Sequence, residues 1–509
     1  MDTIQFQRSG HWSCLLWKDF MQIRPTLIAI VCGGLVMQLL LLVAEHWLDH
    51  AQEATPIIAC LAPLLFVIGA SGMLVGHERQ SGSWDWSSSL PVSWRSALTS
   101  KLLVTTASAI LTGAILAVIP VTLLLTGRLV IDNTSLVVVY LSGSTIIAIL
   151  EVVAYCFLAS LLMRETLTAL VIAGLGLCIA QVAIPALSLA IATDRLVAWG
   201  LTPDFASYLI SLIASLGILA IGLFAMVATF RWRWTIGQRT VLGMRASATA
   251  ATVPSTAYVY SSTESPDSWW VLIRLAMASS IWLRVSAVAL GSLALLDLRD
   301  VTLAPLVLGS GILGLSAFEG DQAHQRYRFL ADRGIAPWKL VVSRLGVAFA
   351  WMLGLWCIRV YSGLTSAGPG GILASELCSL AFLVSALAAI CFRNPVVAAT
   401  VAMVAFIGGL MVYGLSWNYG IMLTRQFGLA TDYEVLAKVL RMTTLMLLPL
   451  TMLVLLVAVF RATRRWIVVD GLHLPLTFIA ALAVGLVLPV AGVFITIYTS
   501  LLASNWPTY

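Results

Sequence analysis

Charge is what this sequence has least of. Only 10% of its 509 residues are charged, and just four of them are lysine. A soluble domain carries about 25% charged residues, so the composition excludes an ordinary water-soluble fold. The short alternating strands of a membrane barrel are also missing. What the chain has instead is apolar stretches of about 20 residues, each able to cross the bilayer as a helix. We therefore expect an all-α, polytopic transmembrane helical bundle.

Several kinds of chemistry lack their residues. The eight cysteines form no CxxC, and seven of them lie in or beside apolar stretches, so we interpret them as apolar fillers rather than disulfide or metal ligands. His46 and His50 are spaced like metal ligands, but no HExxH accompanies them, and an interfacial helix end is the better interpretation. We expect no catalytic residues, no metal and no cofactor. The net charge of +6 reflects basic cytoplasmic loops rather than nucleic-acid binding.

The apolar stretches predict 12 or 13 membrane spans, of which the one at 283–297 is the weakest. They lie at 26–45, 56–76, 102–126, 136–163, 167–191, 208–230, 283–297, 301–318, 344–363, 372–392, 395–415, 442–460 and 476–503. With the N-terminus in the cytoplasm, 22 of the 29 Lys and Arg residues fall on cytoplasmic segments. The positive-inside rule therefore predicts a multi-pass protein of the cell (inner) membrane with its C-terminus outside.

The chain repeats itself at an offset of 243 residues. This offset aligns two charged cytoplasmic loops, each between the second and third span of its half. It pairs Glu78 with Asp321, Trp84 with Tyr327, Trp86 with Phe329, Ser100 with Ser343, and Lys101 with Arg344. An aromatic, amphipathic segment precedes each half, at 11–24 and 268–284, and is predicted to lie along the membrane interface. We expect two parallel six-span repeats, an arrangement common among transporters.

The repeat divides the chain into four parts. Residues 1–243 form the first transmembrane half, with its interfacial lead helix and six spans. The small, polar, Pro-containing segment 244–268 is typical of a flexible cytoplasmic linker. Residues 269–465 form the second half, and residues 466–509 carry an additional C-terminal span. Small-residue runs at 69–72 and 309–314 favour close helix packing.

The two charged loops resemble those of ABC-2 type transporter permeases. In that family an acid, a short polar run, hydrophobic positions, a proline and a basic residue lead into the third span. Here the first loop runs from Glu78 through "SLPVSW" to Lys101, and the second from Asp321 through "RFLADRGIAP" to Arg344. The second loop lacks the Gly-Ser pair of the first. The fused halves and the thirteenth span also depart from the usual six-span subunit.

The resemblance implies that each loop holds a coupling helix that contacts an ATPase. The implied docking residues are Glu78, Arg79, Trp84, Trp86, Arg95, Asp321, Arg326, Tyr327, Phe329 and Arg333. The sequence has no G-x-x-x-x-G-K-[ST], so ATP would bind a separate chain, and two loops would suit two nucleotide-binding subunits. The resemblance also implies an exporter. Besides these subunits and membrane lipid, the partner is an unidentified transported substrate.

Two other functional classes compete with this hypothesis. A proton-coupled secondary transporter of the major facilitator type also has six plus six spans, but the chain matches that family's loop motif only in part of the second half. A membrane-embedded enzyme would need a convergent catalytic cluster, which the sequence lacks. Glu151 and Glu376 lie inside predicted spans, where a carboxylate must face protein or water. They are candidates for a translocation pathway, with a structural role as the alternative.

Overall fold

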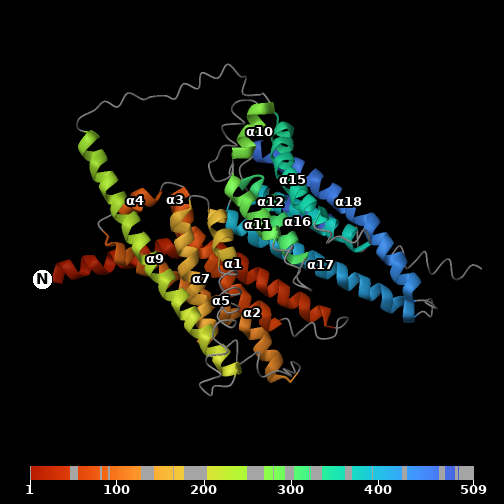
Figure 1. Cartoon of the computed structure of the whole chain (residues 1–509), viewed down its shortest axis with the longest axis horizontal. Coiled ribbons are helices and arrows are strands. Elements are labelled where there is room, and N and C mark those ends of the chain that lie inside the picture. The colour runs from red at the N-terminus through yellow and green to blue at the C-terminus, as the bar shows by residue number, and fades with distance from the viewer. Residues whose placement is uncertain are drawn as a thin grey trace, which may run out of the picture. The chain divides into compact units, whose positions relative to one another are not determined.

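The structure is a computed structural model, and every regular element in its described part is a helix (Figure 1). The described residues are 2–45, 55–80, 83–89, 92–127, 143–163, 166–176, 203–248, 269–278, 280–292, 303–319, 321, 335–361, 369–392, 394–426, 433–468, 476–485, 487 and 491. The all-α, polytopic helical fold predicted from the composition is thereby confirmed.

Seven helices in the described part are long and apolar enough to cross a membrane. They contain the segments Trp12–Val43, Thr55–His77, Trp94–Leu125, Leu212–Ile236, Pro337–Cys357, Pro395–Val412 and Leu447–Arg464. A bent helix pair, Trp269–Ala278 and Ile281–Ser292, would make an eighth, and five further apolar helices are shorter. These features identify a membrane protein. Several expected spans run beyond the described residues, so the total of 13 stays a prediction, and so does the orientation.

The chain forms two compact units. The first contains residues 1–32 and 56–262, and the second contains residues 33–55 and 263–509. The division after Ser262 falls inside the predicted linker, whose first five residues end helix α9 and whose remainder lies outside the described residues. The second unit also takes in residues 33–55, a feature that no sequence pattern indicated.

Helices α1 to α9 build the first unit. They are α1 (Asp2–Ala44, up to residue 32), α2 (Thr55–Ser71), a π-helical turn η2 (Gly72–His77), α3 (Glu78–Gln80), α4 (Ser83–Ser89), α5 (Trp94–Leu125), α7 (Gly143–Leu162) and α9 (Pro203–Ala248). Buried aliphatic and aromatic side chains fill the space between them, among them Phe66, Phe157 and Phe230. Because lipid tails are as apolar as these side chains, their close packing stabilises the unit mainly through van der Waals contacts between helices.

Helices α10 to α18 build most of the second unit. They are α10 (Trp269–Ala278), α11 (Ile281–Ser292), α12 (Leu303–Ser316), α15 (Pro337–Tyr361), α16 (Pro369–Cys391), α17 (Pro395–Gln426) and α18 (Tyr433–Val468). Glycines allow two of these helices to approach their neighbours closely. A Cβ on Gly309 would lie 2.8 Å from the Ala287 carbonyl oxygen, and one on Gly314 would collide with the Phe382 backbone. The predicted packing role of the run at 309–314 is confirmed.

The two lead segments differ from each other. Residues 11–24 are not a separate helix but an internal part of α1, which begins at Asp2 and continues through Pro25 into the first apolar stretch. Asp19 and Gln22 fit into this buried helix because side chains and carbonyls of η2 and α5 bind them. In the second half the lead breaks, because Ser280 adopts a φ of 52° and α10 and α11 meet at 63°. Arg284 stabilises this break by donating to the Ala276 carbonyl at 2.7 Å.

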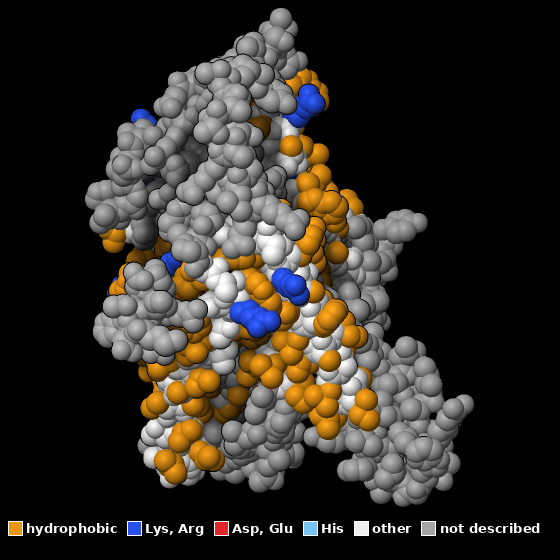
Figure 2. Space-filling view, turned by 90° about the vertical axis from the view of Figure 1, so that its left-hand side faces the viewer, with side chains coloured by type: hydrophobic (Ala, Val, Ile, Leu, Met, Phe, Trp, Pro, Cys, Tyr) orange, Lys and Arg blue, Asp and Glu red, His pale blue; other side chains and the backbone are white. Residues whose placement is uncertain are grey.

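Much of the described surface is apolar. Figure 2 shows one face on which hydrophobic side chains predominate and Lys or Arg appear at a few places. Large side chains such as Phe224 (78% exposed), Leu125 (82%) and Ile221 (68%) point outward from α5 and α9. In water such a surface would aggregate, whereas in lipid it is the expected exterior of a helical membrane protein.

Candidate functional site

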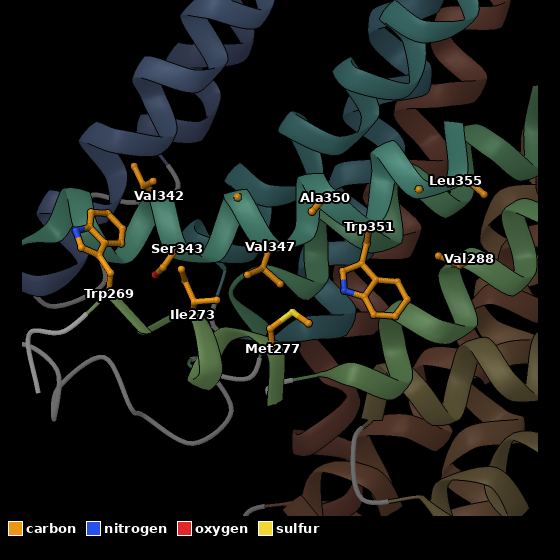
Figure 3. A pocket seen from close by; sticks show the side chains of 12 residues that line it. Trp269, Ile273, Met277, Val288, Val342, Ser343, Val347, Ala350, Trp351 and Leu355 are labelled. Atoms are coloured by element: carbon orange, nitrogen blue, oxygen red, sulfur yellow. The ribbon is translucent and has the colours of Figure 1, made fainter. Parts of the chain in front are cut away.

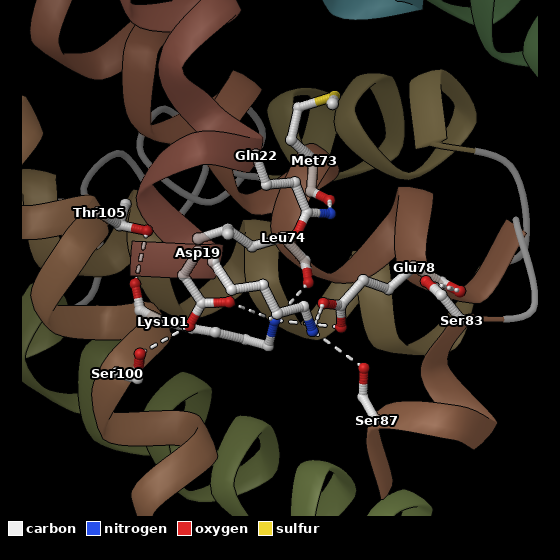
Figure 4. Close-up of polar contacts among 11 residues, drawn as sticks. Asp19, Gln22, Met73, Leu74, Glu78, Ser83, Ser87, Ser100, Lys101 and Thr105 are labelled. Carbon is white, nitrogen blue, oxygen red and sulfur yellow. Dashed lines mark hydrogen bonds and ion pairs between the residues drawn. The ribbon is translucent and has the colours of Figure 1, made fainter. Parts of the chain in front are cut away.

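Four charged residues meet in the interior of the first unit, and we call them the first ion-pair cluster (Figure 4). Lys18 and Asp19 come from α1, Glu78 opens α3, and Lys101 lies in the second turn of α5. Lys101 Nζ lies 3.1 Å from Glu78 Oε2 and 3.3 Å from Asp19 Oδ1, and Lys18 Nζ lies 2.7 Å from Glu78 Oε1. Three elements distant in sequence are thus joined by charge.

Hydroxyl groups complete this cluster. Ser100 Oγ donates to Asp19 Oδ2 at 2.7 Å, and Lys18 Nζ donates to Ser87 Oγ at 2.9 Å. The Ser87 contact brings in α4, the helix of the charged loop. Buried charges are tolerated only when they are paired and hydrogen-bonded, and this cluster meets both conditions.

The π-helical turn η2 supplies backbone acceptors to the cluster. Lys101 Nζ donates to the Leu74 carbonyl at 2.8 Å, and Gln22 Nε2 donates to the Met73 carbonyl at 2.5 Å. A π-helical turn changes the backbone hydrogen-bond pattern and is frequent at functional sites. Thr166 packs tightly against this turn, since a Cβ on Gly76 would lie 3.0 Å from Thr166 Oγ1. The second span therefore ends in an irregular turn bound by side chains of α1 and α5.

Electrostatics keep Glu78 ionised. Burial of its side chain, 2% exposed, raises the pKa, but the ammonium groups of Lys101 and Lys18 outweigh burial and lower the pKa below its ordinary value of 4.5. Glu78 therefore remains a carboxylate throughout the physiological pH range. Glu78 is therefore a permanently charged member of the cluster.

A second ion pair lies inside the second unit. Asp321 and Arg344 are both buried, with side-chain exposures of 1% and 0%. Arg344 Nε lies 2.7 Å from Asp321 Oδ2, and Nη2 donates to Asp321 Oδ1 at 2.8 Å. The pair thus combines one charge-assisted hydrogen bond, from Nη2, with a second close contact between opposite charges at Nε. Arg344 belongs to α15, the long apolar helix that follows the second charged loop.

The two ion pairs occupy equivalent positions in the repeat. Glu78 and Asp321 differ by 243 residues, and Lys101 and Arg344 differ by the same 243. In each unit an acid at the start of the charged loop is paired with a base in the second turn of the helix that follows the loop. The offset found by self-alignment therefore matches an equivalence in space, even though every charged side chain has changed its type.

The other expected docking residues of the first loop are described in part. Arg79 donates from Nη1 to the carbonyls of Ser160, Leu161 and Met163, so it caps the C-terminus of α7. Trp84 is 5% exposed, with its ring centroid 5.3 Å from that of Phe230 and 5.7 Å from that of Trp234. These two side chains and Glu78 anchor the loop to its own unit.

Arg95 has a different position. It is exposed at the start of α5, and its guanidinium lies 5.5 Å from the Trp94 ring centroid. Trp86 belongs to helix α4, but its side chain is outside the described residues. Arg326, Tyr327, Phe329 and Arg333 also lie outside the described residues, as do His46 and His50. Docking through these residues stays a prediction.

The two candidate pathway carboxylates differ in burial. Glu151 of α7 is 1% exposed, one turn before Tyr155, whose hydroxyl donates to the Ile218 carbonyl at 2.9 Å. Glu376 of α16 is partly exposed, and its Oε2 is a buried atom with no hydrogen-bond partner among the described residues. They do not align at the repeat offset, which argues against a shared role.

Sequence reasoning missed Lys18, Asp19 and Arg284 as members of charged sites. Lys101 and Arg344 were identified as repeat partners, but their pairing with the loop acids was not predicted. One signal was present: an acid and a base that keep both their spacing and their opposite signs across a repeat are candidates for a pair. For Asp19 the signal was its place in an otherwise aromatic and apolar helical segment.

The arrangement is suited to mechanical coupling. Each pair joins an acid at the beginning of a charged loop to a basic residue near the start of the long apolar helix that follows. Among the described residues no group of three His, Cys, Asp or Glu side chains is placed to hold a metal ion.

Comparison with family models, with curated proteins and with solved structures found no match to this chain.

Proposed function

We propose that the chain is the membrane-spanning permease subunit of a transporter, of the ABC-2 type, driven by a separate ATP-hydrolysing subunit. The observation that supports it best is the duplicated ion pair between the charged loop and the following helix. A permease driven by two ATPase subunits needs two binding surfaces for them, each connected to the membrane helices so that movement of the ATPase moves the helices. Each loop here begins at an acid that is ion-paired with a basic residue of the next long helix, Glu78 with Lys101 and Asp321 with Arg344.

The expected mechanism follows from this geometry. ATP binding closes two ATPase subunits, and their movement displaces both loops. Because Glu78 and Asp321 are paired with Lys101 and Arg344, the displacement tilts α5 and α15 rather than bending the loops. Helix α7 would move together with the first loop, because Arg79 of the loop is hydrogen-bonded to three carbonyls at the C-terminus of α7. The permease then opens alternately to the two sides of the cell membrane, with export as the proposed direction.

Recovery of the partner tests this proposal. The full-length tagged chain is purified from its native membrane after mild crosslinking, and copurifying chains are identified by mass spectrometry. We expect a protein with a Walker-type ATP site. R95E and Y327E should reduce its recovery, whereas R24E, at an exposed arginine outside both loops, should not. A wild-type chain that recovers no ATPase would contradict the proposal.

A proton-coupled carrier is the second candidate, and the burial of Glu151 inside α7 favours it. A buried carboxylate in a membrane helix is a frequent proton carrier. Proteoliposomes that contain the purified chain and a pH-sensitive dye distinguish the two functions. The carrier predicts proton flux without ATPase that E151Q abolishes, while the permease predicts no such flux.

A further inference from the structure

Each unit has an apolar groove between its lead helix and the following long helix. The first groove, of about 470 Å³, lies between α1 and α5 and is lined by Leu16, Trp17 and Phe20 on the α1 side. The second groove, of about 630 Å³, lies between α10, α11 and α15 and is lined by Trp269, Ile273 and Met277 on the α10 side (Figure 3). The apolar faces of the lead segments thus border open space.

The two grooves are equivalent by the repeat. Five residues of α5 line the first groove, from Leu103 to Leu111, and each has a counterpart 243 residues later. All five counterparts, from Gly346 to Gly354 on α15, line the second groove. The grooves are therefore a duplicated feature, and their differences in size and charge can be compared position by position.

Glycines widen the second groove. Gly346 and Gly354 stand where the first half has Leu103 and Leu111, and a Cβ added to either glycine meets no atom within 4 Å. Neither glycine adopts a positive φ. Neither glycine is therefore required by a turn or by close packing against a neighbouring helix. The absence of their side chains leaves empty space along the outer face of α15.

Aromatic side chains lie at one end of the second groove, and two basic residues lie close in sequence to residues that line it. Trp269 and Trp338 form an edge-on pair with centroids 5.5 Å apart, and Arg274 of α10 is exposed. Lys339 lies one turn before Ser343, on the same side of α15 as the groove. In the first groove Lys18 follows Trp17 as Arg274 follows Ile273, and Lys18 is bound to Glu78 and Ser87.

We propose that the second groove binds one acyl chain of an anionic phospholipid, with the headgroup at Arg274 and Lys339. The groove wall is apolar apart from Ser343, whose hydroxyl donates to the Leu340 carbonyl, and it extends about 20 Å along α15 from Val342 to Leu355. Tryptophans mark the membrane interface, and basic pockets between membrane helices attract anionic headgroups. The charge distribution predicts that this end faces the cytoplasmic leaflet.

Photocrosslinking tests this assignment. The full-length protein is placed in nanodiscs with phosphatidylglycerol or phosphatidylcholine that carries a diazirine in the acyl chain, and labelled peptides are quantified by mass spectrometry. We expect phosphatidylglycerol to label α10 and α15 in preference to phosphatidylcholine. Each basic residue near an anionic headgroup contributes roughly fivefold, so R274Q should lower this preference by about that factor.

A variant whose groove is filled by larger side chains tests whether the groove itself binds the lipid. G346L together with G354L introduces the residues of the first half into open space, so the fold should be retained while labelling falls severalfold. L353F on an exposed face of α15 outside the groove is the matched control and should label as the wild type does. The reciprocal L103G with L111G should raise labelling of α5.

Three outcomes would overturn the proposal. The first is a wild-type groove that no lipid labels, as expected if another polypeptide or a copy of this chain fills it. The second is equal loss of labelling in the filled variant and in L353F. The third is equal labelling by the two lipids. None of these outcomes depends on an ATPase partner, so the result is independent of the proposed transport mechanism.

Discussion

The two ion pairs differ in how many charges surround them, and this difference determines what a single substitution does. In the second unit Asp321 faces two nitrogens of a fully buried guanidinium. In the first unit Lys101 contacts both Glu78 and Asp19, and Lys18 is 35% exposed. Removal of Glu78 therefore leaves Lys101 with Asp19, and Lys18 can turn towards water.

We predict that D321N destabilises the protein more than E78Q does. Breaking a buried ion pair by removing one partner costs about 3–5 kcal/mol, because a buried charge is left uncompensated. D321N should approach that range, and E78Q should fall below it. Thermal unfolding in detergent, followed by intrinsic fluorescence, measures both. The double variant D321N/R344M removes both charges and should recover most of the loss. Equal destabilisation by D321N and the double variant would show that the pair is not what holds the loop.

The lowered pKa of Glu78 predicts a dependence of stability on pH. Because its pKa is lower in the folded than in the unfolded state, the ionised group contributes stability above its ordinary value of 4.5. That contribution is lost as the pH falls through the folded pKa. The unfolding temperature of the wild type should therefore fall below about pH 4.5 more steeply than that of E78Q. Parallel curves for the two proteins would contradict the assigned role.

At the residue scale the sequence located the charged loops but not the orientation of their side chains. The offset of 243 identified Glu78, Asp321, Lys101 and Arg344 as corresponding positions. The resemblance to ABC-2 permease loops implied that both acids are docking side chains. The structure instead buries both acids against bases in the next helix. Partner choice of this kind depends on how helices cross, which a single sequence does not encode in any short pattern.

At the scale of elements, glycines in apolar helices divide into two groups. Some permit close packing, as Gly314 does against the Phe382 backbone, and others border open space, as Gly346 does. Sequence reasoning assigned the run at 309–314 to packing correctly. It did not distinguish the glycines of α15, since helical spacing does not show whether a neighbouring helix approaches. The break between α10 and α11 was missed for a similar reason: Ser280 carries no strong helix-breaking signal.

We predict opposite effects for alanine at these two kinds of glycine. G314A places a Cβ against backbone, which cannot move as a flexible side chain can, so α12 must shift away from α16 and stability should fall by roughly 1–3 kcal/mol. G346A meets open space and replaces the poorest helix former after proline by the best, so it should be neutral or stabilising by up to about 1 kcal/mol. The unfolding temperatures of the two variants measure the difference. A loss of stability in G346A would mean that the groove is already filled by protein.

At the scale of the molecule, the repeat predicted two halves, each continuous in sequence, joined by a linker. The two compact units of the structure are instead each made of two separate segments of the chain. The break after Ser262 lies in that linker, but the second unit also contains residues 33–55. Within this unit Gly33 lies against Val404 of α17, since a Cβ there would be 2.7 Å from Val404 Cγ2, and Leu40 lies near Gly408. Self-alignment compares sequence with sequence, so it does not show where a long helix finds its packing partners.

This division predicts the behaviour of a split protein. If the chain is cut at 255, fragment 256–509 lacks residues 33–55 of its own unit, and expressed alone it should be unstable in the membrane. Co-expression with fragment 1–255 should restore it, and the two should copurify. G33L in the first fragment should weaken this rescue, because the added side chain meets Val404, whereas C32L at the exposed neighbouring position should not. If fragment 256–509 is equally stable with and without its partner, residues 33–55 contribute nothing to the second unit, and the halves fold as the repeat alone would predict.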